Sequence, residues 1–313
     1  VAGLGRVRQV SATENTSAAL TEAGEVWVWG LQAEGPELPQ PTRVQNLPGA
    51  ARFIATSGIA CYAVLADGSV WRWSNPTTPR QLDGFANIRE VTALISYNGG
   101  AVFALGTAGQ LFATGQNAMG FLGIGSTEPV DGVIAVPGAP WQSVSAVGAN
   151  AGGYVMALRT DGSLFYWGEN VSGISGEATL LSRSVPVREV AGLTGIVAVS
   201  AGKNASFAVA QDGQVYGWGN GAQGQLGDGT LLPRSRAAPI SGLPTISQAA
   251  AGAQFALFLA ADGSVWQTGV LGDLNTRVPA RVAGLADIVR IAAGCHLAFA
   301  VDRAGRLYQW GGY

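Results

Sequence analysis

The sequence is poor in charged residues and in residue types that commonly carry chemistry. Asp, Glu, Lys and Arg make up 12% of its 313 residues, and Lys203 and His296 are its only lysine and histidine. With a formal net charge of −2, the chain lacks the basic surplus that attracts nucleic acid or an anionic membrane. No apolar run approaches the roughly 20 residues that a membrane-spanning helix needs. We therefore expect no nucleic-acid partner and no membrane insertion.

The two cysteines form no metal-binding pattern. Cys61 and Cys295 have no further cysteine or set of histidines at zinc-ligand spacing, and His296 is merely adjacent to Cys295. They are expected as buried, inert thiols, with a single disulfide as the alternative. The segment Asp228-Gly229 lacks the alternating acidic ligands of a calcium loop. The sequence thus predicts no metal and no cofactor.

What the sequence does contain is one pattern repeated seven times. Each copy has a small residue and Gly, then Val or Leu, an aromatic residue and Trp or Thr at alternate positions, as in residues 23–30 and 212–219. The marker glycines are Gly24, Gly68, Gly109, Gly162, Gly213, Gly263 and Gly305. A spacing of about 47 residues over the whole chain is typical of a propeller in which each copy forms one blade.

Each copy reads as four antiparallel strands. Asp-Gly between two alternating apolar runs is a strong hairpin signal, because a type I′ turn needs positive φ at both central residues. A strand ending in Ala-Gly precedes this hairpin, and a short proline-bearing strand, suited to a blade's outer edge, follows it. The predicted fold class is all-β, a single seven-bladed β-propeller over residues 1–313. The expected blades are 6–47, 50–85, 88–138, 141–193, 195–243, 246–285, and 288–311 together with 1–4.

The two ends of the chain predict how the ring closes. Residues 1–4 are identical to residues 190–193 and 282–285, which both belong to expected outer strands. The chain stops soon after the third strand of its last copy. We therefore expect the N-terminal segment to supply the fourth strand of the last blade, which would remove a free sheet edge.

The glycine-rich loops after the aromatic strands carry a family resemblance. Residues 219–229 resemble the signature of the regulator of chromosome condensation repeat, residues 115–125 match it nearly as well, and residues 168–176 form a weaker copy. The resemblance implies a seven-bladed propeller. Known members include a nuclear exchange factor for a small GTPase, a plant ultraviolet-B photoreceptor and secreted bacterial inhibitors of β-lactamase. The chain resembles bacterial members more than the exchange factor, whose Gly-x-x-His turn keeps a histidine here only at His296.

The sequence offers little for catalysis. A serine or cysteine triad would need His296, but neighbours on a strand point to opposite faces, which separates the side chains of Cys295 and His296. The carboxylates are scattered over turns, whereas acid–base hydrolysis needs two that converge. We expect a protein that is not an enzyme. An enzyme site at the central opening and small-GTPase exchange are the less favoured alternatives.

Binding is expected on one face. The turns between first and second strands and the loops between third and fourth strands share a face, and both differ among copies. This favours a non-catalytic protein-binding scaffold, with a carbohydrate-binding propeller as the alternative. The predicted partner-binding residues are Tyr62, Tyr97, Asn98, Met119, Phe121, Asn150, Tyr154, Lys203, Asn204, Phe255 and His296.

The tryptophans divide into two groups. Eight of the nine lie in third strands and are expected to be buried between blades. The ninth, Trp141, falls outside the pattern and is either a partner anchor or a residue packed locally against prolines.

Source and location are predicted from the resemblance and the first residue. Because the sequence begins with Val1 and not with Met, it is expected to be a processed or cut chain. We expect a bacterial, exported or cell-surface interaction module or inhibitor, monomeric, whose partner is another protein.

Overall fold

The computed structural model describes residues 1, 3–32, 34–58, 60–96, 99–148, 153–170, 173–176, 183–190 and 192–312. These residues form 27 strands and no helix, so none of them provides a helix long and apolar enough to cross a membrane. Six sheets have four strands and the seventh has three, each arranged in chain order. The predicted all-β fold of seven blades is confirmed.

The strands divide evenly among the blades. The first three blades consist of β1 (Val7–Ala12), β2 (Thr16–Thr21), β3 (Val26–Gly30) and β4 (Leu38–Arg43); β5 (Ala51–Thr56), β6 (Cys61–Leu65), β7 (Val70–Trp73) and β8 (Arg80–Leu82); β9 (Ile88–Ser96), β10 (Gly99–Gly106), β11 (Leu111–Gly115) and β12 (Val130–Val136). The remaining four consist of β13 (Trp141–Gly148), β14 (Gly153–Arg159), β15 (Leu164–Gly168) and β16 (Arg183–Glu189); β17 (Ile196–Ala201), β18 (Ala205–Ala210), β19 (Val215–Gly219) and β20 (Arg234–Pro239); β21 (Ile246–Ala251), β22 (Phe255–Ala260), β23 (Val265–Leu271) and β24 (Leu274–Arg281); β25 (Ile288–Ala293), β26 (Leu297–Asp302) and β27 (Leu307–Gly311).

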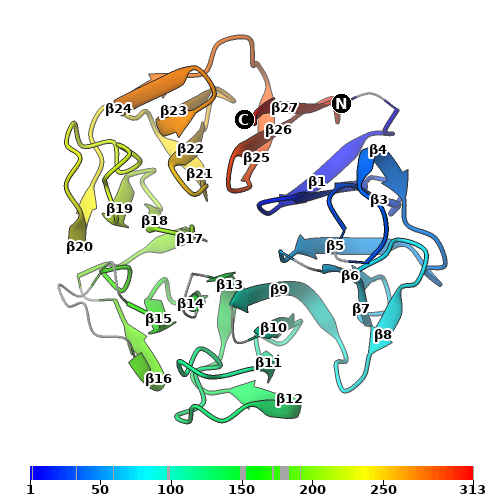
Figure 1. Cartoon of the computed structure of the whole chain (residues 1–313). Helices are drawn as coiled ribbons and strands as arrows, with labels where there is room; N and C mark the ends of the chain where they lie inside the picture. The colour runs from blue at the N-terminus through cyan, green and yellow to red at the C-terminus, as the bar shows by residue number, and fades with distance from the viewer. Residues whose placement is uncertain are drawn as a thin grey trace.

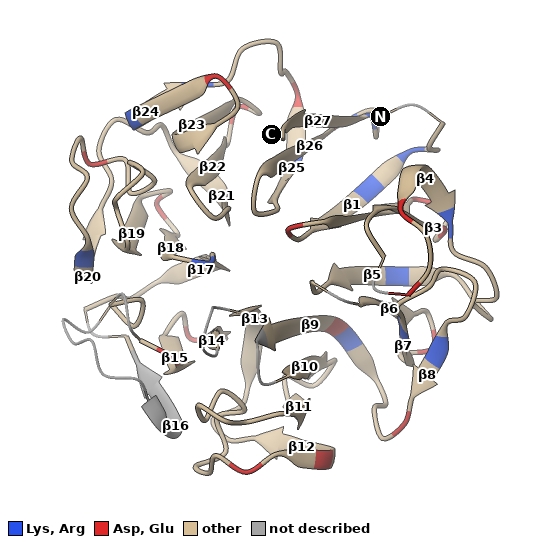
Figure 2. Cartoon of the chain, viewed as in Figure 1, with Lys and Arg blue, Asp and Glu red and all other residues tan. Residues whose placement is uncertain are grey.

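The blades stand around a ring, with the first strand of each blade toward the axis and the fourth at the periphery (Figure 1). Each sheet falls within one of the blade ranges expected from the repeat. We call the side that carries the first-to-second turns and third-to-fourth loops the loop face, and the opposite side the hairpin face. Acidic and basic residues are spread around the ring instead of gathering in one sector (Figure 2).

The N-terminal segment meets the last blade, but it forms no regular strand among its described residues. The Val1 ammonium donates to the Leu307 carbonyl oxygen at 2.9 Å, and Leu4 packs against the apolar cluster shared by the first and last blades. The described part of the last blade is the three-stranded sheet of β25, β26 and β27. The predicted location of this segment is therefore correct, whereas a fourth strand built from residues 1–4 is not observed.

The hairpins differ from the type I′ turn that the Asp-Gly pairs predicted. In blade two only Gly68 of the pair has a positive φ, +82°, and its N–H donates to the Leu65 carbonyl at 3.0 Å. The Asp67 carboxylate accepts hydrogen bonds from the backbone N–H of Ser69 at 2.9 Å and from its hydroxyl at 2.7 Å. A longer hairpin with a left-handed glycine after an ordinary turn results. Asp161 and Asp262 make the same pair of bonds in blades four and six.

Apolar packing between blades forms the core, and the tryptophans take part in two ways. At the second aromatic position Trp73, Trp167 and Trp218 are almost completely buried. At the first position, closer to the hairpin face, Trp71 and Trp266 are half-buried, and each indole N–H donates to a hairpin serine at 3.1 Å. Trp27 and Trp310 are also half-buried, while Trp29 is buried. Full burial of all eight is therefore wrong, because the hairpin end of the third strand reaches solvent.

Trp141 is a core residue, so the prediction of a partner anchor is wrong. It opens β13 and is completely buried. Its ring meets Phe165 edge-on with centroids 5.3 Å apart and lies 6.1 Å from the Trp167 ring. The bulk of the indole fills the space between blades three and four.

Candidate functional site: the mouth of the central channel

The ends of the inner strands are small because they crowd together around the axis. A side chain on Gly202 would meet the Ala251 side chain and the Gly252 backbone of the next blade. A side chain on Gly294 would meet the Thr13 carbonyl of the first blade in the same way. The Ala-Gly dipeptides of the repeat are therefore needed for close approach of neighbouring backbones. They leave an opening on the loop face.

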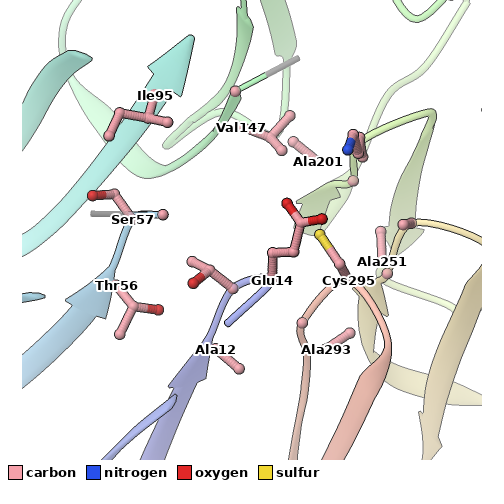
Figure 3. Close-up of a pocket in the computed structure, with 18 of the residues that line it drawn as sticks. Ala12, Glu14, Thr56, Ser57, Ile95, Val147, Ala201, Ala251, Ala293 and Cys295 are labelled. Atoms are coloured by element: carbon pink, nitrogen blue, oxygen red, sulfur yellow. The ribbon is translucent and has the colours of Figure 1, made fainter. Parts of the chain in front are cut away.

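This opening is a pocket of about 420 Å³ to which all seven blades contribute (Figure 3). Its wall is made chiefly of alanine, glycine, serine and threonine. Figure 3 shows the Glu14 and Cys295 side chains next to each other and directed into the opening. The Lys203 backbone and side chain contribute to the opposite wall. The site can thus offer one carboxylate, one ammonium and many small polar groups to a ligand.

The thiols near this site are not activated. Burial raises the pKa of Cys295; the Glu14 carboxylate raises it further, and the Lys203 ammonium opposes the shift. Burial also raises the pKa of Cys61 to about 12. Both thiols are free and therefore protonated at neutral pH. The expectation of two thiols and no disulfide is confirmed, although Cys295 is only half-buried.

Two glutamines hold the inner strands in register around the mouth. The Gln9 amide donates to the Ile54 carbonyl at 2.9 Å and accepts from the Ile54 N–H at 3.0 Å. Gln248 makes the same pair of bonds with Ile291, at 2.9 and 3.1 Å. Each side chain replaces a backbone strand partner across the gap between two blades. Sequence reasoning missed this role, although both glutamines stand two residues after the start of an inner strand.

The long loops of blades three to five raise one side of the loop face. Each loop is held by the third strand of the following blade: the Trp167 indole donates to the Phe121 carbonyl at 2.8 Å, and the Trp218 indole to the Ile174 carbonyl at 2.7 Å. In blade six Thr268 takes this position and donates to the Gln225 carbonyl at 2.7 Å.

The asparagines of these loops are structural. The buried Asn117 amide oxygen accepts the Leu122 N–H at 2.9 Å, and Asn170 accepts the Ser175 N–H at 2.8 Å. A side chain on Gly123 would collide with the Trp167 indole. The Asn and Gly residues of the repeat signature therefore close the loop and admit the next blade's tryptophan, so they contact the protein itself and not a ligand.

Several predicted binding residues lie in the core. Phe121 and Tyr154 are completely buried, and Tyr62 and Phe255 are at most 5% exposed. The Tyr154 hydroxyl donates to the Gly202 carbonyl at 2.7 Å. The expectation that these four side chains form an exposed interface is wrong, because second-strand residues that directly follow a turn already point between blades.

The remaining predictions have a different outcome. Lys203, Asn204, His296 and Met119 are half-buried, with Met119 packed against the core of blades three and four. The Asn204 amide donates to the Ala253 carbonyl of the next blade at 3.2 Å. Tyr97, Asn98 and Asn150 lie outside the described residues. Among the half-buried set, Lys203 is the one that lines the mouth.

An exposed apolar patch at the rim escaped sequence reasoning. Leu231 and Leu232, in the long loop of blade five, are 40% and 69% exposed. The Gly229 N–H donates to the Arg277 carbonyl at 2.8 Å, which holds this loop beside the exposed Val278 of blade six. We call these three residues the rim patch. The adjacent leucines between glycine-rich and proline-bearing segments were the available signal.

Fold and site together define a closed seven-bladed propeller with a variable loop face around a polar central mouth. Residues 212–259 match the regulator of chromosome condensation (RCC1) repeat, and residues 7–35 and 196–225 match a second description of that repeat. The chain belongs to the RCC1-like repeat family.

Curated relatives show how widely this repeat is used. The chain is similar to the E3 ubiquitin-protein ligase HERC2 of Mus musculus, with 30% identity over 74% of this chain and 5% of the ligase. It is also similar to two proteins of Arabidopsis thaliana: the mitochondrial RCC1 domain-containing protein RUG3, at 26% identity over 93% of this chain and 62% of that protein, and the ultraviolet-B receptor UVR8, at 27% over 74% and 57%. The chain thus spans less than two thirds of each relative.

Solved structures agree on the fold. Human WBSCR16 superposes with a TM-score of 0.82 at 16% identity, covering 96% of this chain and 88% of that one. Prp20p, the RCC1 of Saccharomyces cerevisiae, gives a TM-score of 0.54 at 18% identity, covering 97% and 72%. At these identities the likeness concerns the fold alone.

Proposed function

We propose that this chain is a non-catalytic protein-binding scaffold whose partner docks on the loop face, over the central mouth and against the rim patch. RCC1-like propellers commonly serve in protein interaction. Prp20p has been studied for its binding to Gsp1p and histones. The observation that carries the proposal for this chain is the rim patch, two adjacent exposed leucines held on a rigid raised loop beside an open polar mouth.

The physical argument combines anchoring and rigidity. Exposed leucines that lose solvent contact supply apolar binding energy, while bonds from one blade to the next fix the loop and lower the entropy cost of docking. Glu14 and Lys203 at the mouth add charges of opposite sign that orient a partner. Arg234 pairs with Asp228 at 2.7 Å at the base of the same loop, which stiffens it further.

Absence of catalysis belongs to the same proposal. Hydrolysis by a thiol needs a thiolate, and the pKa of Cys295 is raised. The described mouth residues offer Glu14 without a second carboxylate beside it. Carbohydrate binding depended on Tyr97, Asn98, Asn150 and Tyr154, of which Tyr154 is buried. A bacterial source, export and β-lactamase inhibition stay predictions, and the relatives named above come from mouse and Arabidopsis.

The test compares the two faces. The immobilised chain is used to capture a partner, and affinity is then measured for a loop-face variant with L231S and L232S. A matched control carries V197S and V289S, which remove similarly exposed side chains, 43% and 44% exposed, near the hairpin face. We expect the leucine variant to weaken binding by at least about tenfold and the control by less than twofold, since a few anchors dominate an interface. Equal affinity of both variants would contradict the proposal.

A further inference from the structure

Blade seven has an outer edge that differs from those of the other blades. β27 pairs with β26 on one side, and among the described residues no strand pairs with its other side. The Leu307 carbonyl points to that side, because it accepts the Val1 ammonium. Since backbone groups alternate along a strand, those of Gln309 face the same way as those of Leu307. Two residues of β27 thus present ladder positions to an open slot.

The register of Val1 shows what this slot resembles. In blade six the Val282 N–H donates to the Val265 carbonyl at 2.8 Å. Val282 is the residue that directly follows the outer strand β24, which ends at Arg281. Val1 makes the corresponding bond to Leu307, and residues 1–4 repeat residues 282–285. Val1 therefore occupies the place just past an outer strand, and the place of the strand itself is open.

Blades one, four and five repeat this arrangement. There Val44, Val190 and Ile240 donate to the first residue of the third strand, at 2.9, 2.6 and 2.9 Å, and each directly follows the outer strand β4, β16 or β20. The bond of Val1 is thus a conserved feature of the blade geometry, and it fixes the register of any strand added to β27.

A groove runs along this edge. Its volume is about 800 Å³, and Leu4, Val282, Leu285 and Leu307 contribute apolar walls. Val282 and Leu285 come from blade six, so the groove lies between the last two blades (Figure 1). An unpaired strand edge beside an apolar groove is the geometry of strand addition, in which main-chain bonds give affinity and side-chain pockets give specificity.

Charge at the edge distinguishes the occupant. In blade one Arg43, the last residue of β4, pairs with Glu25, the residue before the third strand, at 3.0 Å. In blade seven the residue in the position of Glu25 is Arg306, whose side chain is 73% exposed. Opposite charges across neighbouring strands stabilise pairing and like charges oppose it. The strand that fits β27 therefore ends in an acidic residue where β4 ends in arginine.

We propose that the free edge of β27 binds an extended segment of a partner protein as the fourth strand of blade seven, with an Asp or Glu opposite Arg306. This second interface lies at the periphery of the ring and is separate from the loop-face mouth. It also differs in mechanism, since recognition runs through the backbone of Gln309 and through one charge pair.

The test uses a synthetic peptide with the sequence of Leu274–Arg281, the outer strand of blade six, carrying R281E. We expect saturable binding by calorimetry, with increased hydrogen-exchange protection at Gln309. The peptide with the original arginine should bind about threefold to fivefold more weakly, the range expected for reversing one cross-strand charge pair. A scrambled peptide is the control for composition.

Variants of the protein make the charge pair falsifiable. R306E should reverse the preference between the two peptides, and R306Q should abolish it while keeping the Asp302 backbone contacts. L231S with L232S should leave peptide binding unchanged, which separates this proposal from the loop-face proposal. Absence of binding, protection elsewhere than β27, or the same peptide preference in wild type and R306E would overturn it. Self-association of the chain that the peptide does not compete with would assign the edge to a second copy and also overturn it.

Discussion

The hairpin face and the loop face are built from the same strands but are stabilised differently. On the hairpin face each turn contains its own bonds, as between Asp67 and Ser69. On the loop face the bonds cross from blade to blade, as between Trp218 and Ile174 or between Tyr154 and Gly202. A change in a hairpin should stay local, whereas a change under the loop face should disturb the neighbouring blade. The loop face is thus a rigid surface that carries variable residues.

Truncating Tyr154 should have the largest effect on this contrast. Y154A removes a completely buried ring and its bonds to Gly202 and Ser206, which should lower the free energy of unfolding by about 3–5 kcal/mol. Y154F keeps the ring and should cost about 1–3 kcal/mol, because the buried Ser206 hydroxyl and Gly202 carbonyl lose a partner. Denaturant unfolding measures both values. A Y154A protein as stable as wild type would show that the residue is not part of the core.

Adding one methyl group to an inner-strand end should have an intermediate effect. In G252A the new methyl would overlap the Phe255 ring, and overpacking of this kind costs about 1–3 kcal/mol. The matched variant G132A lies in β12, where no atom is within 4 Å of the added carbon. We expect its stability to equal or slightly exceed that of wild type. Similar losses in both variants would mean that crowding at the mouth is not the reason for glycine.

The glutamine bridges between blades should contribute less. Q248A removes both hydrogen bonds to Ile291, and about 1–2 kcal/mol should be lost, since the Ile291 backbone groups are then unpaired between strands. Q248E should be intermediate, because a carboxylate can accept the Ile291 N–H but cannot donate. Thermal unfolding of the two variants side by side decides whether the amide or the side-chain volume matters.

Sequence reasoning reached the repeat architecture because hairpin glycines and alternating aromatics are local signals. It failed where a position is decided by the next blade. Tyr154 and Phe255 follow turns and carry large side chains, which suggested exposure, yet neighbouring blades cover them. Gln9 and Gln248 looked like ordinary strand residues because their partners, Ile54 and Ile291, lie more than 40 positions away. Leu231 and Leu232 were missed because loop exposure depends on tertiary packing.

The hairpin face should respond to acid, and this is the smallest expected effect. Hydrogen bonds from Ser264 lower the pKa of Asp262, and those from Ser69 and Ser163 do the same for Asp67 and Asp161. A carboxyl with a lowered folded-state pKa stabilises the fold above its unfolded value of about 4. That contribution is lost as the pH falls through the lower, folded-state pKa.

The aspartate contribution can be measured with an amide variant. Replacing Asp262 by Asn should reduce the pH dependence of the melting temperature on the acid side, while leaving the melting temperature at neutral pH nearly unchanged, because Asn can still accept the Ser264 N–H. An unaltered acid profile would contradict the assignment. A large loss of stability at neutral pH would show that the hairpin is not a local unit.

The central claim is that the loop face is the binding surface, and hydrogen exchange of the chain with its captured partner tests it most directly. We expect added protection in residues 228–233 and at the turns lining the mouth, around Glu14, Lys203 and Cys295. The hairpins around Gly68, Gly162 and Gly263 should exchange as in the free chain. Protection confined to those hairpins, with residues 228–233 unchanged, would contradict the account.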